Sequence, residues 1–459
     1  MTLAEGDSNA TPRRAEWQAR NLDYEARELL AQDARYFLHQ SLSTPCLNVV
    51  DAADGAWIMD SAGRRYLDFH GNAVHQVGYG NPRVVSAVVE QLHKLPFSPR
   101  RYTNRPAIAL ARKLAELAPG DLSRVLFTTS GATANSAAIQ LARVATGRHK
   151  TISMWDSFHG GTLDTISVGG EAQFRAGIGP LLAGTEHVPP SDPYRCPFRC
   201  QDRVGACDLS CARYLEYVLE KEGDVAAVIA ETVRNTPSIP SPEYWQEVRR
   251  ACDRHGALLI LDEVPHALGR TGRFFTVEHF GIVPDMLVIG KGLGGGIMPL
   301  AALIARDGLN VAADRALGHF THEKNPVACA AGLATIAEIE ERGLVRQAAE
   351  LGAWALDELR LMQARHPLVG DVRGLGLLMG VELVRDRATR EPAADEAEAV
   401  MYECLSRGLS IKTAMGCVLH LSAPLIVTRE ELGLALAILD DSIAAVERNA
   451  SPQAGLAAN

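Results

Sequence analysis

The sequence predicts an α/β protein with a mostly parallel sheet that carries helices on its faces. The first observation is an alternation of strand-like and helix-like segments, which begins near residue 124. The second is the aliphatic run 258–261, which is typical of a strand buried on both faces and is followed by Asp262. The third is a similar run, 286–289, after which Lys291 follows. Both charged residues are therefore expected at the carboxyl edge of the sheet, where open α/β sheets bind ligands.

The segments before this region and after it have other patterns. We expect residues 1 to about 20 to form a loose arm and residues 451–459 a frayed tail. Helices are predicted over 22–38, 81–92, 107–117, 136–145 and 345–365, and a hairpin over 57–68. Strands are predicted over 124–128, 150–154, 225–230, 258–261 and 287–289, and a strand pair or bent strand over 372–383. We expect an arm and part of a small domain in 1–75, a large domain in 76–325 and a small α+β domain in 326–459.

The composition is that of a globular enzyme, with 459 residues of which 47% are hydrophobic and 22% charged. The formal net charge is -9 and no basic block is present, so a nucleic-acid partner is not expected. No apolar run approaches the roughly 18 residues of a membrane span, and the first residues lack a signal pattern. A cytoplasmic location without a membrane partner is therefore expected.

Asp262 and Lys291 suit one cofactor in particular. An aspartate can keep the ring nitrogen of pyridoxal phosphate protonated, and a lysine can form an imine with the aldehyde. An ordinary ion pair would also account for the two residues. The cofactor interpretation is favoured because several predicted strands end in chemically suited residues on the same edge.

The loop Ser130-Gly131-Ala132 follows a predicted strand and opens a helix. Small residues let backbone N–H groups approach a phosphate, and the helix dipole adds about 0.3–1 kcal/mol per charge. Such a loop is weak support when taken alone, because glycine often stands in strand–helix turns for steric reasons.

Three further residues follow or end predicted strands. Phe158 could stack on a flat ring, although a lone Phe more often fills a core; His159 could equally be a structural histidine. Glu231 closes the strand 225–230, where a solvated charge is the ordinary interpretation.

Four of the nine cysteines cluster in the sequence, namely Cys196, Cys200, Cys207 and Cys211. They could form a metal site. The spacing differs from that of zinc ribbons, and Pro197 and Gly205 indicate an irregular segment. We therefore expect a cysteine-rich surface loop and no metal.

The motifs in combination resemble those of class III pyridoxal phosphate-dependent aminotransferases. The resemblance runs from about residue 45 to about residue 445. It is carried by the stretches 130–135 (SGATAN), 158–160 (FHG), 262–264 (DEV), 269–272 (GRTG), 291–296 (KGLGGG) and 325–331 (NPVACAA).

The resemblance implies fold type I, a seven-stranded sheet, pyridoxal 5'-phosphate (PLP) as cofactor and a homodimer with sites at the subunit interface. Lys291 then matches the Schiff-base lysine and Asp262 the partner of the ring nitrogen, and both are the catalytic candidates. Thr321 matches a threonine that reaches the neighbouring subunit's cofactor phosphate. The candidate cofactor-binding residues are Ser130, Gly131, Ala132, Phe158, His159, Glu231, Asp262, Val264, Lys291 and Thr321.

The sequence departs from the family pattern in three places. Pro265 stands where the family usually has Gln, and the segment 321–326 carries His, Glu and Lys where aromatic and small residues are common. His420 stands where the family often has an Arg that grips the substrate carboxylate, and His lacks the guanidinium fork. Another arginine, Arg373, could take over. The candidate substrate-binding residues are His322, Lys324, Arg373 and His420.

The resemblance favours transamination from a small amine or ω-amino acid to a keto acid. The alternative is a PLP-dependent lyase that eliminates ammonia or phosphate from an aminophosphonate or a phosphorylated amino alcohol, as 1-hydroxy-2-aminoethylphosphonate ammonia-lyase does. The departures at Pro265, His420 and 321–324 favour the lyase. A non-catalytic protein that kept the fold would be expected to lose Lys291 or Asp262, and both are present.

Overall fold

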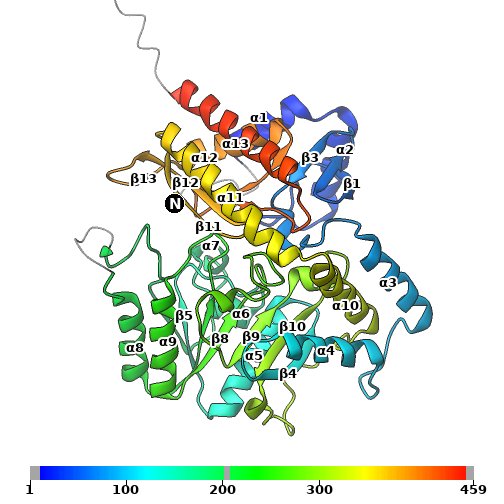
Figure 1. Ribbon diagram of the computed structural model, residues 1–459, viewed down its shortest axis with the longest axis vertical. Coiled ribbons are helices and arrows are strands. Elements are labelled where there is room, and N and C mark those ends of the chain that lie inside the picture. The colour runs from blue at the N-terminus through cyan, green and yellow to red at the C-terminus, as the bar shows by residue number, and fades with distance from the viewer. Residues whose placement is uncertain (1–10, 201–206, 451–459) are drawn as a thin grey trace, which may run out of the picture. The chain divides into compact units, whose positions relative to one another are not determined.

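The computed structural model describes residues 11–200 and 207–450, which divide into two compact units (Figure 1). The larger unit holds residues 72–77 and 81–346, and the smaller unit holds the other described residues. The sequence predicts the second domain boundary at residue 325. In the structure the next helix, α10 (Pro326–Glu341), belongs to the larger unit, because it packs on α3 (Pro82–Lys94) and α4 (Arg105–Leu117) of that unit.

The larger unit is built on a seven-stranded sheet in the order β4-β10-β9-β8-β7-β5-β6, which confirms the predicted fold class. Its strands are β4 (Leu122–Thr128), β5 (Lys150–Met154), β6 (Thr185–Val188), β7 (Val225–Glu231), β8 (Leu258–Asp262), β9 (Met286–Ile289) and β10 (Ala301–Arg306). Strands β5 to β9 pair in parallel, and β10 runs antiparallel to both of its neighbours.

Helix α5 (Gly131–Thr146) lies across one face of this sheet and contacts β4, β10, β9, β8 and β7. Ser130 caps its N-terminus, and Gly147 ends it in the left-handed conformation with φ 66°. Its sheet-facing side chains are small, so the helix can approach the strands closely. The buried contacts are Ala134, Ala137, Ala138 and Ala142 of α5 with Ala227, Ile229, Ile260, Val288 and Leu303 of the sheet.

The remaining helices of the larger unit surround the sheet. They are α6 (Leu163–Val168), α7 (Ala172–Arg175), α8 (Ser210–Glu222) and α9 (Pro242–His255), with the short 3-10 helices η1 (Gly71–Ala73), η3 (Thr276–His279), η4 (Lys291–Gly294) and η5 (Asp307–Leu309). Helices α8 and α9 pack against each other, and α9 also contacts β8.

The smaller unit contains two sheets, ordered β1-β2-β3-β14 and β11-β12-β16-β15. The predicted hairpin is β2 (Trp57–Asp60) with β3 (Arg65–Asp68), and the predicted strand pair is β11 (Val369–Leu375) with β12 (Leu378–Asp386). The other strands are β1 (Val50–Asp54), β13 (Glu391–Pro392), β14 (Leu409–Ser410), β15 (Lys412–Ala414) and β16 (Val418–Ser422). The helices are α1 (Pro12–Asn21), α2 (Tyr24–Tyr36), α11 (Leu344–Arg365), α12 (Ala394–Ser406) and α13 (Arg429–Ala450).

The expectation of a loose arm up to about residue 20 is wrong for residues 12–20, which form α1. Thr11 caps this helix, and Trp17 anchors it, with 4% of the residue exposed. The indole Nε1 of Trp17 donates to Ser406 Oγ at 3.1 Å. A buried tryptophan thus helps to hold a helix whose other residues are mostly polar. Residues 1–10 of the expected arm and the expected tail at 451–459 lie outside the described chain.

Membrane-spanning segments were sought among the helices of the described chain. None of them is both long enough and apolar enough to cross a bilayer.

Candidate active site

Five predicted site residues come from the carboxyl ends of strands in the larger unit. Ser130 follows β4, Phe158 follows β5, Glu231 and Asp262 end β7 and β8, and Lys291 follows β9. Glu231 and Asp262 are partners in the parallel register of β7 and β8, so they stand side by side. The alternation of strand and helix therefore delivers these groups to one edge of the sheet.

Asp262 is a buried carboxyl group with three hydrogen-bond donors. Asn135 Nδ2 and His159 Nδ1 approach Oδ2 at 2.7 Å and 2.9 Å, and the backbone N–H of Val264 donates to Oδ1 at 3.0 Å. Burial raises the pKa of Asp262, but the hydrogen bond and charge of His159, with the other two donors, outweigh burial and hold it below its ordinary value. Asp262 is therefore a negative charge fixed in a dry environment.

Glu231, its neighbour, is in a different electrostatic situation. Burial is the largest influence and raises the pKa of Glu231, against the lowering effect of Arg234 and His159. The negative charge of Asp262 raises the pKa further. Two adjacent carboxyl groups thus have pKa values pushed in opposite directions, a pattern common at catalytic sites.

The side chain of Val264 packs against two loops that carry candidate residues, the loop at Gly131 and the loop at Gly290. A Cβ atom placed on Gly131 would lie 2.8 Å from Val264 Cγ2, and one placed on Gly290 would lie 3.4 Å from Val264 Cγ1. Val264 therefore packs against the first turn of α5 and against the residue that precedes Lys291. Glycine at position 131 is required for this close approach.

The turn after β5 packs against the same end of α5. A Cβ atom on Gly160 would lie 2.4 Å from Ala132 Cβ, and Gly160 has a φ of 131°, which few other residues adopt. Phe158 just before it is 39% exposed, and its ring centroid lies 4.3 Å from that of Phe174. His159 is buried, and its Nε2 lies 3.4 Å from Ser153 Oγ.

Lys291 opens η4 with a φ of 47°, in the left-handed region that non-glycine residues seldom occupy. Such backbone strain is concentrated at functional sites, where surrounding packing maintains it. Gly292 allows this packing, because a Cβ atom there would lie 1.8 Å from Gln76 Oε1. Gln76 is buried, and its amide atoms have no hydrogen-bond partner within the described chain.

Thr321, His322 and Lys324 lie in the loop before α10, and all three are exposed. The loop is fixed to the segment that precedes α4. Asn104 Nδ2 donates to the carbonyl oxygen of Lys324 at 2.8 Å, and the His322 ring centroid lies 5.4 Å from that of Phe97.

Arg373 and His420 belong to the smaller unit, on β11 and β16. Arg373 Nη1 lies 2.7 Å from Asp371 Oδ2 and 2.7 Å from Glu382 Oε2, so two carboxylates of the same sheet already neutralise the guanidinium. His420 is buried. Their role toward a substrate stays a prediction.

Sequence reasoning assigned no role to Asn135, Glu263 or Gln76. Asn135 holds Asp262, and its signal is a polar residue on the alanine-lined face of α5. Glu263 is fully buried; Thr232 Oγ1 and the backbone N–H groups of Thr276 and Val277 donate to it at 2.9, 2.7 and 2.6 Å. These contacts fix the turn after β8.

The family model described as "Aminotransferase class-III" matches residues 39–443. The chain belongs to the class-III aminotransferase family. This class-III family protein is therefore an enzyme, and its cofactor is PLP.

Individual relatives of this family member carry out different reactions. The chain is 48% identical over 456 residues to (R)-1-hydroxy-2-aminoethylphosphonate ammonia-lyase of Vibrio splendidus, covering 96% of this chain and 95% of the relative. It is 38% identical over 430 residues to leucine/methionine racemase of Thermococcus litoralis, covering 92% and 96%. A PLP-bound amine transaminase from an uncultivated Pseudomonas species superposes with a TM-score of 0.84 at 31% identity, covering 89% and 98%. Family membership alone thus leaves the reaction open.

Proposed function

We propose that this class-III enzyme is a PLP-dependent ammonia-lyase that acts on a hydroxy-aminoethylphosphonate or a closely similar amine. The similarity to the Vibrio splendidus ammonia-lyase, 48% identical along 96% of this chain, carries the proposal. The departures at Pro265, His322, Lys324 and His420 support it, because the family pattern usually has other residues at these positions, and at His420 an Arg that grips the carboxylate of an amino acid substrate.

The residues at the carboxyl edge fit the cofactor. The first turn of α5 has N–H groups without intrahelical acceptors, and Gly131 leaves room for close approach, so Ser130, Gly131 and Ala132 would hold the phosphate. Asp262 is an ionised, buried carboxylate, which suits a protonated ring nitrogen. The proposed contacts to the ring and its aldehyde come from Phe158, His159, Val264 and Lys291, with Glu231 toward the substrate and Thr321 donated across a homodimer interface.

When bound, PLP supplies an aldehyde that combines with amines and a ring that draws electrons from the amine-bearing carbon. The Lys291 Nζ would take a proton from that carbon, while Asp262 would keep the proton on the ring nitrogen. In the proposed substrate the neighbouring carbon carries a hydroxyl, and the protonated Lys291 would give its proton to this group, so that the group would leave as water. Hydrolysis of the resulting enamine consumes that water and releases ammonia and an aldehyde that retains the phosphonate. The net reaction is therefore loss of one ammonia, and no oxidant or amino acceptor is consumed.

A phosphonate needs cationic or hydrogen-bonding partners. His322 and Lys324 are exposed in the loop before α10 and offer such donors. Arg373 is a weaker candidate than the sequence suggests, because Asp371 and Glu382 already pair with it.

Transamination is the second candidate. It is favoured by the fold similarity to the PLP-bound amine transaminase, at a TM-score of 0.84. It differs from the lyase reaction in one requirement, since the amino group must pass to a keto acid.

The test is to incubate the purified PLP-loaded enzyme with 1-hydroxy-2-aminoethylphosphonate and no keto acid, and to follow ammonia and aldehyde. We expect sustained release of both in equal amounts over many turnovers. Ammonia release that occurs only with an added keto acid, or stops after one turnover, would reject the lyase proposal in favour of transamination.

The Lys291→Ala variant is the control for the proposed chemistry. Removal of a general base typically costs about 10²–10⁴-fold in rate, so ammonia release should fall by at least that much. A Lys291→Ala enzyme that released ammonia at the normal rate would contradict the assignment of the base.

A further inference from the structure

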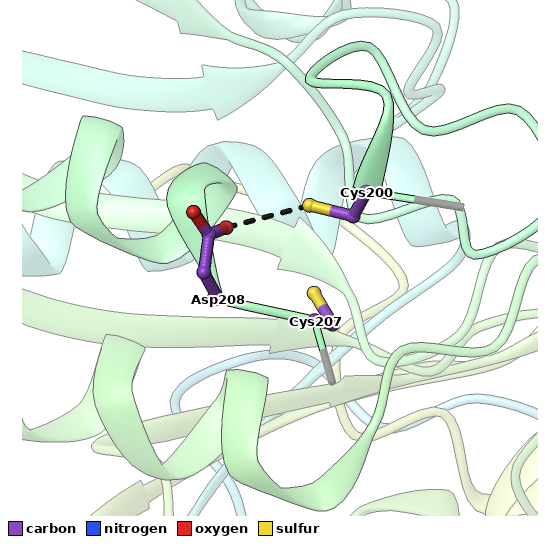
Figure 2. A group of neighbouring side chains, drawn as sticks. All are labelled: Cys200, Cys207 and Asp208. Atoms are coloured by element: carbon purple, nitrogen blue, oxygen red, sulfur yellow. Dashed lines mark hydrogen bonds between the residues drawn. The ribbon is translucent and has the colours of Figure 1, made fainter. Parts of the chain in front are cut away.

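Three cysteines, Cys196, Cys200 and Cys207, lie in the connection between β6 and α8, and a fourth, Cys211, lies in the first turn of α8. Cys200 Sγ, Cys207 Sγ and a carboxylate oxygen of Asp208 all lie within 4.8 Å of one another. Figure 2 shows these three side chains and the hydrogen bond between Cys200 and Asp208. Cys200 Sγ donates to Asp208 Oδ1 at 3.4 Å. Chain segments on both sides of residues 201–206 thus meet at this point.

The other two cysteines belong to the same cluster. Burial raises the pKa of the Cys200 thiol, and hydrogen bonding with Asp208, Cys196 and Cys207 raises it further. Cys211 lies in the first turn of α8, is 6% exposed, and interacts electrostatically with Cys196 and Cys207. All nine cysteines of the chain are among the described residues, and none of them forms a disulfide.

The separations suit a tetrahedral metal ion. With Zn–S bonds of about 2.3 Å, the sulfurs of a tetrahedral zinc site stand roughly 3.8 Å apart. Atoms that lie within 4.8 Å of one another need to move inward by only about an ångström to reach this geometry. Soft thiolate ligands of this kind select zinc among the common divalent ions.

One backbone N–H donates to a sulfur of the cluster. The backbone N–H of Leu209 donates to Cys207 Sγ at 3.4 Å. Hydrogen bonds of this kind from outside the ligand set orient metal-binding sulfurs and stabilise their negative charge.

Two candidates could supply the fourth ligand, namely Asp208 and Cys211. The Asp208 carboxylate is already engaged, because Ser210 Oγ donates to Oδ1 at 2.7 Å and Arg213 Nη2 lies 3.1 Å from Oδ2. Cys211 is four residues after Cys207, and it is buried in the first turn of the helix that follows.

We propose that Cys196, Cys200, Cys207 and Cys211 bind one structural zinc ion, with Asp208 as an outer support. The ion would join the connection after β6 to the first turn of α8. Because a structural zinc site contributes binding energy only to the folded arrangement, it stabilises this connection directly. The proposal does not depend on which reaction the enzyme catalyses.

The first experiment measures zinc by elemental analysis in the full-length enzyme purified without chelators. We expect about one zinc per chain in the wild type. We expect little or none in Cys196→Ser, Cys200→Ser, Cys207→Ser or Cys211→Ser. Cys46→Ser, which alters a half-buried cysteine outside the cluster, is the matched control and should keep its zinc.

A second experiment keeps the proposal testable if a variant fails to fold. The wild-type enzyme is stripped with a chelator and loaded with Co²⁺, which should give the absorption of tetrahedral thiolate coordination, and Asp208→Asn should give the same spectrum. A wild type with neither zinc nor cobalt–thiolate absorption overturns the proposal, as does a Cys200–Cys207 disulfide found by mass spectrometry of freshly purified protein. Loss of zinc in Asp208→Asn but not in Cys211→Ser overturns the assignment of the fourth ligand.

Discussion

Asp262 stays ionised in a buried position because two side chains and one backbone N–H donate to it. A hydrogen bond to a charged group is worth about 1.5–3 kcal/mol, which is more than an ordinary hydrogen bond. The amide of Asn135 makes the shortest of these contacts, 2.7 Å, and also donates to the carbonyl oxygen of His159 at 2.9 Å. Asn135 therefore positions both partners of the pair.

Substitution Asn135→Leu should lower the free energy of unfolding by about 1.5–3 kcal/mol, because Asp262 loses its amide donor while the volume is retained. Urea denaturation of the wild type and the variant measures this. Gln140→Leu is the matched control, since Gln140 lies on the same helix, is half-buried and, within the described residues, its side chain bonds only to Ser136. Its effect should stay within about 0.5 kcal/mol. Equal stability of Asn135→Leu and the wild type would show that the amide does not support the carboxylate.

For single residues, the sequence predicts which side chains lie at the carboxyl edge of the sheet, but it does not predict their hydrogen-bond partners. Asp262 and Lys291 follow from strand-end positions, because parallel strands present their carboxyl ends to one edge. The partners of a side chain depend on three-dimensional neighbours. Asn135 approaches Asp262 from another element, and Glu382 approaches Arg373 across the antiparallel register of β11 and β12.

The turn after β5 packs tightly against the first turn of α5, where Gly160 contacts Ala132. Gly160→Ala would place a methyl group 2.4 Å from Ala132 Cβ, at a φ of 131°. Overpacking of this kind costs about 1–3 kcal/mol, and it would displace the first turn of α5, where we propose that the PLP phosphate binds.

We therefore expect Gly160→Ala to weaken PLP binding by about tenfold for each 1.4 kcal/mol of strain transmitted to the helix start. Titration of the cofactor-free enzyme with PLP, followed by absorbance, measures the dissociation constant. The neighbouring Gly161→Ala is the control, because no atom lies within 4 Å of the added methyl group. If both variants bind PLP like the wild type, the α5 contact does not shape the phosphate site.

Most helices and strands were predictable from hydrophobic periodicity, and the failures have clear causes. Strand β10 is a short aliphatic run that resembles a helix segment as closely as a strand, and only its pairing with β4 and β9 decides the matter. Helix α1 is mostly polar, and it is held by two buried side chains, Arg14 and Trp17. In both cases tertiary contacts, and not local sequence, determine the structure.

The stability of the whole protein should depend on pH through Glu263. Burial raises the pKa of this carboxyl group from 4.5 to about 7, despite its hydrogen bonds from Thr276, Thr232 and Val277. The folded protein therefore binds the proton more tightly than the unfolded chain does. This contribution to stability is complete below pH 4.5 and is lost as the pH rises through about 7.

The loss amounts to about 3 kcal/mol, from 1.36 kcal/mol per pKa unit. Glu263→Gln removes the titrating group, so the decrease in the urea midpoint between pH 5 and pH 8 should be smaller in this variant than in the wild type. Glu116→Gln, at an exposed position on α4, should retain the wild-type pH dependence. An unchanged pH dependence in Glu263→Gln would show that Glu263 is ionised throughout this range.

The antiparallel direction of β10 affects the position of Lys291. Strand β9 ends just before the lysine, and β10 returns beside it with Ile289 opposite Ala302. The segment between them is thus a connecting loop whose two ends lie on neighbouring, hydrogen-bonded strands. A parallel pair would instead need a longer crossover connection between the strands. A shift of β10 by one residue in register would move each of its side chains to the opposite face of the sheet and would displace the loop that contains Lys291. The position of Lys291, the candidate Schiff-base lysine, is accordingly set by strand alignment.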